Sequence, residues 1–355
     1  MRKNRRMNHR QPKTNLYKLP FSANEFHDMP FVRVGDSGLR ASKAGLGTWK
    51  MGLPETGDGA RTGERTSLEI LDRAWELGVT FWDTANRYNE SSGNSERVLG
   101  TWFERNPEKR RDIVLCTKVC GLMDGLTPNH CGLGRANIRD SVHACLERLL
   151  TDRIDLLYFH QFDDATPPEE SLEAIEDLVS EGTVRYFGVS NFRVEQLELY
   201  RGIEVSSSLR CRVVAVQNRF DILTGENPGQ KGVLAYAAEN GISFIAYSPL
   251  ARGLLSDRYL DPAKAGEGDR LFDETGLEAL CSPEVMGKLG QLSDRAKEWE
   301  LPTSRLALAY MHSLPGMGPS IVSASNIDQL EANAAAATID LPEGRRDAIE
   351  MIVQG

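Results

Sequence analysis

The chain alternates short apolar segments with segments of helical periodicity, and this alternation limits its fold more than any other feature. The apolar segments span residues 44–48, 80–84, 113–118, 154–160, 184–190, 213–217, 242–248 and 320–323. Between them, apolar residues recur at helical spacing, most clearly at Ile138, Val142, Cys145, Leu146 and Leu149. Eight strands that alternate with helices predict an α/β fold, a closed (β/α)₈ TIM barrel with eight parallel strands.

The chain before the first barrel strand has two parts. Residues 31–34 and 39–42 read as short strands around a turn at 35–38, which predicts an N-terminal β-hairpin. Residues 1–28 lack hydrophobic periodicity, so we expect a basic, flexible extension followed by a single barrel domain over residues 29–355. The extension is rich in cations, at Arg2, Lys3, Arg5, Arg6 and Arg10. Its twin arginines lack the apolar stretch that an export signal needs.

The competing architecture is an open, doubly wound sheet, which binds a dinucleotide through a Gly-x-Gly-x-x-Gly turn after its first strand. The nearest match, GDGARTG at residues 57–63, has its last glycine one place late, and no strand leads into it. A Walker-type phosphate loop is also absent from the sequence. We therefore interpret residues 57–63 as an ordinary glycine-rich loop and keep the barrel.

Composition narrows the classes of partner. With 355 residues and 40% hydrophobic content the chain can bury a sizeable core, and its net charge of −9 argues against nucleic acid or an anionic membrane as a partner. No apolar run approaches the length of a membrane span. The six cysteines form no Cys-x-x-Cys pair and have no His-rich companion, so we expect no metal site and reduced thiols in a cytoplasmic protein.

Four residues that could reduce a carbonyl lie at or just past the ends of predicted strands: Asp83, Tyr88, Lys118 and His160. In a parallel barrel these strand ends converge on one mouth. Hydride addition to a carbonyl leaves an alkoxide that needs a proton, and Tyr88 is the candidate general acid. A phenol titrates near ~10, and an adjacent ammonium from Lys118 is expected to lower that value. Asp83 would fix the lysine, and His160 would orient the substrate oxygen.

Each of these residues alone has an ordinary structural explanation, as a loop aromatic, a solvated charge, a turn residue or a satisfied polar group. Their coincidence at four strand ends favours catalysis. Side chains alternate along a strand, so if Asp83 faces the barrel mouth, Trp82 should point outward to the helices.

Several motifs in the same order resemble the aldo-keto reductase family, over about residues 31 to 333. They are GLGTW at 45–49, FWDTANRY at 81–88, the helix-to-strand segment 141–157, VRYFGVSNF at 184–192 and AYSPL at 246–250. Within the family, the likeness is to a bacterial branch similar to the potassium-channel β-subunit-like reductases. The resemblance assigns the same four catalytic residues and implies a nicotinamide cofactor, because no side chain can deliver hydride.

The resemblance also implies which residues bind the cofactor. Ser190, Asn191 and Gln217 would bind the carboxamide, and Tyr247 would stack on the nicotinamide ring. The first-strand and Asp/Tyr motifs add contacts from Gly47, Thr48, Trp49 and Asp83. The ribose and pyrophosphate would meet Ser248, Leu250 and Arg258, and the adenosine end Ser325, Gln329 and Asn333.

The sequence supports NADPH as cofactor, with NADH as an open alternative. Many relatives carry Lys or Arg around Ser323 and Gln329 to meet the 2′-phosphate, and arginine's planar fork is hard to replace there. This chain carries neither, and Ala332 stands where some relatives carry Glu.

The substrate is expected to be a small carbonyl compound. Trp49, Met51, Arg87, Tyr88 and His160, with Asn89 and the loop 120–134, would line the mouth, since loops after strands carry specificity in this fold. An aromatic face beside charged donors suits a polyhydroxylated aldehyde, and the loop 271–281 could close over it.

Two further readings stay open. Some barrels of this family are channel-associated subunits that bind nicotinamide tightly and sense its redox state, and an inactive scaffold is a third reading. Exposed helix faces do not reveal oligomeric state, which leaves a homo-oligomer open.

Overall fold

The computed structural model of the chain describes residues 23–123, 125–207, 209–261, 266, 270–273 and 281–354, without the side chains of residues 257, 258 and 270. Residues 1–22, most of the expected extension, lie outside the described residues.

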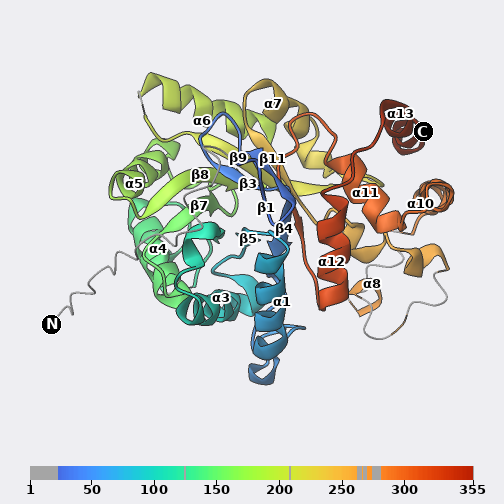
Figure 1. Cartoon of the computed structure of the whole chain (residues 1–355). Helices are drawn as coiled ribbons and strands as arrows, with labels where there is room; N and C mark the ends of the chain where they lie inside the picture. Colours follow the sequence, from blue (N-terminus) through green and yellow to red (C-terminus); the bar gives the residue numbers. More distant parts are fainter. Residues whose placement is uncertain are drawn as a thin grey trace.

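Eight parallel strands close into a barrel, as predicted (Figure 1). They are β4 (Ala44–Gly47), β5 (Phe81–Asp83), β6 (Val114–Val119), β7 (Ile154–Phe159), β8 (Val184–Ser190), β9 (Val213–Asp221), β11 (Ser243–Tyr247) and β12 (Ser320–Val322). The strands follow one another in chain order around the ring. The pairing of β8 with β9 closes the sheet into a barrel. The two-residue strand β10 (Gly225–Glu226) folds back antiparallel on the end of β9.

Helices surround this barrel (Figure 1). The surrounding helices are α1 (Glu64–Glu76), α3 (Asn94–Arg105), α4 (Arg135–Leu149), α5 (Pro168–Ser180), α6 (Val194–Ser206), α7 (Val233–Glu239), α11 (Thr303–Met311) and α12 (Ile327–Ala336). The longer α10 (Pro283–Glu298) and the C-terminal α13 (Glu343–Gln354) lie on the α11 side (Figure 1). Short turns fill the loops: α2 (Tyr88–Ser91), α8 (Arg270–Asp273), η2 (Pro54–Thr56), η3 (Arg110–Asp112), η4 (Pro128–His130), η5 (Pro228–Gln230), η6 (Ala251–Gly253) and η7 (Asp257–Leu260).

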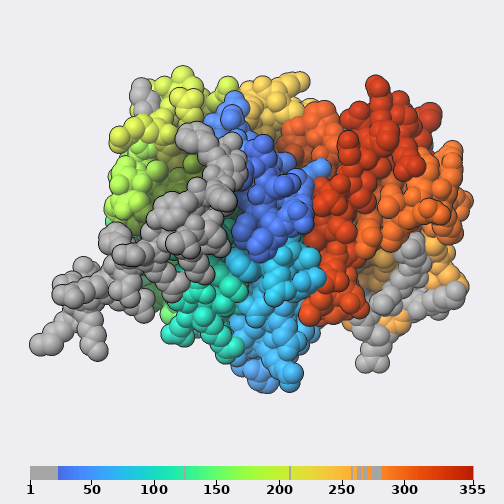
Figure 2. All heavy atoms as spheres, in the orientation of Figure 1, coloured from blue at the N-terminus to red at the C-terminus, as the bar shows by residue number. Residues whose placement is uncertain are grey.

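An antiparallel N-terminal sheet covers one end of the barrel. The predicted hairpin is formed by β2 (Met29–Arg33) and β3 (Arg40–Ser42), and its turn anchors on the barrel through Gly35 N, which donates to Ser243 Oγ at 2.7 Å. Gly35 has φ +55°, and a Cβ there would overlap the carbonyl oxygen of Val214, so this close approach requires glycine. Figure 2 shows the described N-terminal residues, in dark blue, in the middle of the view.

A third strand, β1 (Glu25–Phe26), pairs with β2 and was not predicted. The Phe26 ring lies 5.7 Å from that of Trp75 on α1, and His27 Nδ1 lies 2.8 Å from the carbonyl oxygen of Glu76. Residues 23–28, expected in the flexible extension, therefore belong to the folded barrel domain, because strand pairing and aromatic packing hold them there.

Two apolar layers follow the alternation of side chains along the strands. Inward-facing residues such as Phe81, Tyr158 and Ile245 fill the barrel, together with Val34 and Ala41 of the N-terminal sheet. Outward-facing residues form a larger layer between strands and helices.

Trp82 belongs to the outer layer, as predicted. Its ring lies 4.6 Å from that of Trp102 on α3, and its indole N–H donates to the carbonyl oxygen of Val79 at 2.8 Å. Because Trp82 points outward, the next residue of β5, Asp83, faces the barrel axis at the strand end.

Candidate active site

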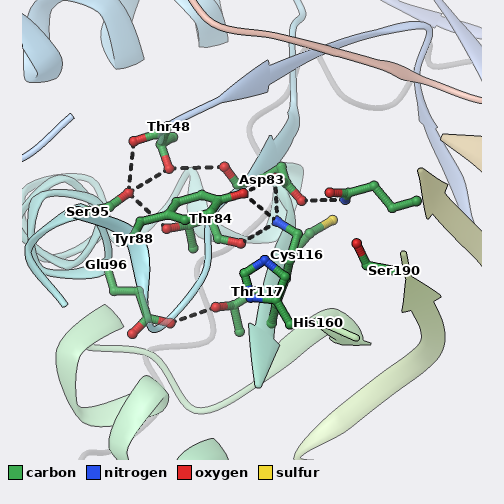
Figure 3. Close-up of polar contacts among 12 residues, drawn as sticks. Thr48, Asp83, Thr84, Tyr88, Ser95, Glu96, Cys116, Thr117, His160 and Ser190 are labelled. Atoms are coloured by element: carbon green, nitrogen blue, oxygen red, sulfur yellow. Dashed lines mark hydrogen bonds and ion pairs between the residues drawn. The ribbon is translucent and has the colours of Figure 1, made fainter. Parts of the chain in front are cut away.

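The four predicted catalytic residues meet at the C-terminal mouth of the barrel, and Figure 3 labels three of them, Asp83, Tyr88 and His160. Lys118 Nζ lies 2.6 Å from Asp83 Oδ2 and 2.8 Å from the Tyr88 hydroxyl, and the rings of Tyr88 and His160 are 6.1 Å apart. Asp83 ends β5, Lys118 lies in β6 and His160 directly follows β7. Neighbouring parallel strands therefore bring together residues that are far apart in sequence.

The Lys118 ammonium is fully engaged although it is buried. Its three N–H groups have three acceptors, namely Asp83 Oδ2, the Tyr88 hydroxyl oxygen and the carbonyl oxygen of Thr84 at 2.8 Å. Lys118 is 1% exposed and Asp83 equally so, and removing either partner would leave an uncompensated buried charge. The pair fixes a positive charge against the phenol oxygen.

The pKa of Tyr88 corrects one prediction. We expected the ammonium to lower it, but burial first, and then the negative charge of Asp83 and the hydrogen bond to Asp83, raise the pKa of Tyr88 well above its ordinary value. These effects favour the neutral phenol and outweigh the ammonium in the resting site. Tyr88 therefore holds its proton before any substrate arrives, as a general acid must.

His160 is a neutral imidazole at the same mouth. Burial, followed by the positive charges of Lys118 and Arg87, lowers the pKa of His160 to about 3. A neutral imidazole carries one N–H donor and one acceptor nitrogen. Near neutral pH His160 can therefore orient a carbonyl oxygen by donating a hydrogen bond, without adding a second full charge beside Lys118.

A cleft of about 980 Å³ leads from these residues across the mouth of the barrel. This volume is at the upper end for small-molecule sites and suits a dinucleotide with a small substrate. Most of the predicted cofactor residues line it: Gly47, Trp49, Asp83, Ser190, Asn191, Gln217, Tyr247, Ser248, Leu250, Ser325, Gln329 and Asn333.

One predicted cofactor residue, Thr48, is absent from the described lining of the cleft. Thr48 is fully buried outside the lining, and its hydroxyl bonds Ser95 Oγ at 2.7 Å and the carbonyl oxygen of Asp83 at 3.0 Å. Successive residues of an extended chain face opposite sides. Gly47 faces the cleft, so the side chain of Thr48, the next residue, faces away from it. The side chain of Arg258 lies outside the described residues.

Polar side chains around the predicted nicotinamide site are held in place by hydrogen bonds. Gln217 Nε2 donates to Asp83 Oδ1 at 2.9 Å, and Asn191 Nδ2 donates to the carbonyl oxygen of His160 at 2.9 Å. The Tyr247 hydroxyl donates to Asn191 Oδ1 at 2.9 Å. Asn191 and Ser248 have φ +61° and +55°, a left-handed conformation that costs non-glycine residues free energy and clusters at functional sites.

The predicted substrate residues Trp49, Met51, Arg87, Tyr88 and His160 all line the cleft. One face of Trp49 is engaged by the Lys50 ammonium, 4.5 Å from the ring centroid. Asn89 is instead buried, and its amide donates to the carbonyl oxygen of Met51 at 2.6 Å. Among the described residues of the loops 120–134 and 271–281, none lines the cleft, and residues 274–280 lie outside the described residues.

Sequence reasoning missed the first turn of α3, whose Ser95 and Glu96 hydrogen-bond residues next to the catalytic group (Figure 3). Ser95 Oγ bonds the hydroxyls of Thr48 and Thr84, and Glu96 accepts from Thr117 Oγ1 at 2.6 Å, next to Lys118. A serine and an acidic residue at a helix start are usually attributed to capping or the helix dipole. No spacing in the sequence distinguishes this role from those.

Within the described ranges, no group of three His, Cys, Asp or Glu side chains could hold a metal ion. The described helices are all too short or too polar to cross a membrane. The six cysteines are unpaired thiols.

Comparison with known proteins agrees with this geometry. Residues 43–354 match the aldo/keto reductase family. The chain is 32% identical over 320 residues to the uncharacterized oxidoreductase YrpG of Bacillus subtilis (strain 168), covering 88% of this chain and 92% of that protein. It is 31% identical to the aldo-keto reductase YhdN of the same strain (86% and 87% covered) and 28% identical to versiconal hemiacetal acetate reductase of Aspergillus parasiticus (88% and 94% covered).

Proposed function

Because this chain belongs to the aldo/keto reductase family, we propose that it is an NADPH-dependent enzyme that reduces an aldehyde or ketone to the alcohol, with Tyr88 as general acid. The observation that carries the proposal is the position of the Lys118 ammonium, 2.6 Å from Asp83 and 2.8 Å from the hydroxyl of Tyr88, which lines the cleft together with His160.

Each residue of this group has one task. The His160 N–H holds the carbonyl oxygen near Tyr88, which gives its proton to that oxygen as negative charge develops there. The phenolate that forms is stabilised by Lys118, whose charge is already in place and needs no reorganisation. Asp83 balances the buried ammonium and keeps its position through a second hydrogen bond, from Gln217.

A nicotinamide supplies the hydride when bound. Ser190, Asn191 and Gln217 would hold its carboxamide, and Tyr247 would pack on its ring. The lining at the other end of the cleft, with Ser325, Gln329 and Asn333, would hold the adenosine.

NADPH is the proposed cofactor, and NADH is proposed to work as well. In the described lining near Gln329, residues 323–333 offer hydroxyls and amides without a Lys or Arg. Gln329 Oε1 also accepts from the backbone N–H and the hydroxyl of Ser325, at 2.9 and 3.0 Å. A 2′-phosphate would here meet neutral donors, which discriminate less strongly than a guanidinium.

The proposed substrates are small aldehydes, including sugar-derived ones. Trp49, Arg87 and His160 would offer such a molecule an aromatic surface and polar donors.

The test is titration of the protein fluorescence with NADPH and with NADH, followed by loss of nicotinamide absorbance with a panel of aldehydes and aldoses. Saturable binding with steady-state turnover is the expected result. Tight binding with one stoichiometric oxidation and a retained cofactor would contradict it and would favour a redox-sensing subunit.

A further inference from the structure

We propose that Arg87 binds an anionic group of the substrate, so that the preferred carbonyl compounds carry a carboxylate or a phosphate. This inference rests on the reductase function proposed above and specifies its substrate class. Three observations support it: where the Arg87 side chain lies, which residues hold it there, and whether a carboxylate balances its charge.

Arg87 lies on the substrate side of the catalytic group. It directly precedes Tyr88 and lines the cleft with Tyr88 and His160, and its side chain is exposed to the solvent of the cleft. Its positive charge reaches His160, because it is one of the causes that lower the pKa of that imidazole. A substrate whose carbonyl oxygen meets Tyr88 and His160 would therefore feel the guanidinium as well.

The guanidinium is held in place along one edge. Arg87 Nε donates to Ser91 Oγ at 2.9 Å, and the N–H of Ser91 donates to the carbonyl oxygen of Arg87 at 3.2 Å. Asn89, Glu90 and Ser91 have φ between 54° and 63°, so a left-handed turn brings Ser91 back to Arg87. This conformation costs free energy for non-glycine residues, and here it orients a cation.

The opposite side of Arg87 is shaped by Gly121, just beyond the end of β6. A Cβ on Gly121 would overlap Nη1 and Cδ of Arg87. The glycine at residue 121 therefore leaves room for the Arg87 side chain in this position, and a larger residue would displace it.

The charge of Arg87 is not balanced by the part of the chain that the structure describes. Two other arginines of the cleft are neutralised, Arg61 by Asp273 and Arg219 by Asp221, each at 2.7 Å. No described carboxylate lies within ion-pair distance of Arg87, whose side chain bonds Ser91. Asp83 is the one carboxylate among the described lining residues, and Lys118 already holds it.

In a chain of net charge −9, a fixed and unbalanced guanidinium beside the reacting groups points to a ligand of opposite charge. The Nη groups of arginine form a planar fork that matches two oxygens of a carboxylate or phosphate. The matching substrate carries such an oxyanion a few bonds from its carbonyl carbon.

The test compares aldehydes that differ mainly in charge, with the full chain and NADPH. Succinic semialdehyde is paired with butanal, and glyceraldehyde 3-phosphate with glyceraldehyde. We expect kcat/KM to be higher for the anionic member of at least one pair. We expect Arg87→Gln to lower kcat/KM for that anion by about tenfold to a hundredfold, mainly through KM, because a hydrogen-bonded charge is lost. The loss with its neutral partner should be much smaller.

Two further variants sharpen the test. Gly121→Ala should reproduce the loss of charge preference, because it displaces the guanidinium without removing it. Arg111→Gln removes one positive charge at an exposed site on η3, and it should leave the preference unchanged.

The outcomes separate cleanly. A gain confined to one pair would identify the anion as carboxylate or phosphate. Equal losses with charged and neutral aldehydes in Arg87→Gln would mean that Arg87 only positions Tyr88, and would overturn the inference, as would a wild-type preference for the neutral members. Absence of turnover with every aldehyde would overturn the proposed reductase function, and this inference with it.

Discussion

In the proposed mechanism, Tyr88 and Lys118 act at different stages of proton transfer, one in the resting site and the other during the reaction. In the resting site, burial and Asp83 hold the pKa of Tyr88 well above its ordinary value, so the phenol remains protonated. As the proton leaves, the negative charge moves onto an oxygen that already lies 2.8 Å from the ammonium. The stabilisation therefore grows as the reaction proceeds, which is the condition for lowering the barrier rather than for binding alone.

A substitution at Gln329 tests the proposed adenosine-binding end of the cleft. Replacing Gln329 with Arg should raise the preference for NADPH over NADH by about tenfold, because a guanidinium adds a charge-assisted hydrogen bond to the 2′-phosphate. The ratio of kcat/KM for the two cofactors is the measurement. Gln329→Ala is the matched control, since it removes the same bonds to Ser325 without adding charge. An unchanged ratio in the arginine variant would misplace the adenosine site.

Helix α3 is the element that ties the catalytic strands together. Its residue Ser95 bridges Thr48 after β4 and Thr84 after β5, and Thr84 in turn accepts from Lys118 (Figure 3). The next residue, Glu96, is fully buried between Thr117 of β6 and Arg148 of α4, with Arg148 Nε at 2.6 Å. One helical turn thus fixes three strand ends that carry the site.

This buried pair predicts a large effect on stability. Glu96→Gln should lower the free energy of unfolding by about 3–5 kcal/mol, because it breaks the buried ion pair between Glu96 and Arg148. Adding Arg148→Met should restore part of that loss. Denaturant unfolding of the single and double variants is the measurement. If the two losses simply add, the residues do not act as a pair.

The fold was more predictable from sequence than the supports of the site. All eight barrel strands and the outward position of Trp82 followed from apolar segments and alternation, because burial dictates residue type there. Strand β1 was missed because two residues carry no periodicity. The burial of the Thr48 side chain was not predicted, because motif resemblance does not tell which way a side chain points after a strand ends. The high pKa of Tyr88 depends on burial, which only the packed site reveals.

For the whole molecule, two half-buried histidines link stability to pH. Burial lowers the pKa of both His160 and His312 to about 3, with nearby lysines adding to the effect. Unfolded histidine titrates near ~6.5, so between roughly pH 6.5 and 3 the unfolded chain binds more protons than the folded one. Stability is therefore complete above pH 6.5 and is lost as the pH falls. Glu204 and Asp221, whose pKa values are raised by burial, act in the opposite direction.

Replacing His312 isolates its contribution to the pH dependence of stability. His312 bonds Ser320 Oγ at 2.8 Å and lies away from the catalytic group. We expect His312→Gln to reduce the stability lost between pH 7 and pH 5 by about 2 kcal/mol, because its proton uptake is removed from the unfolded chain. Denaturant unfolding at both pH values measures this difference, and His143→Gln, at an exposed site, should behave as wild type. An unaltered loss in His312→Gln would show that His312 titrates normally in the folded protein.

The most direct test of the proposed role of Tyr88 is Tyr88→Phe, assayed for NADPH binding by protein fluorescence and for aldehyde reduction by nicotinamide absorbance. We expect kcat to fall by about 10²–10⁴-fold, because the proton donor is lost, while the dissociation constant for NADPH changes little. A variant that binds NADPH and reduces aldehydes at the wild-type rate would contradict the assignment of Tyr88 as general acid.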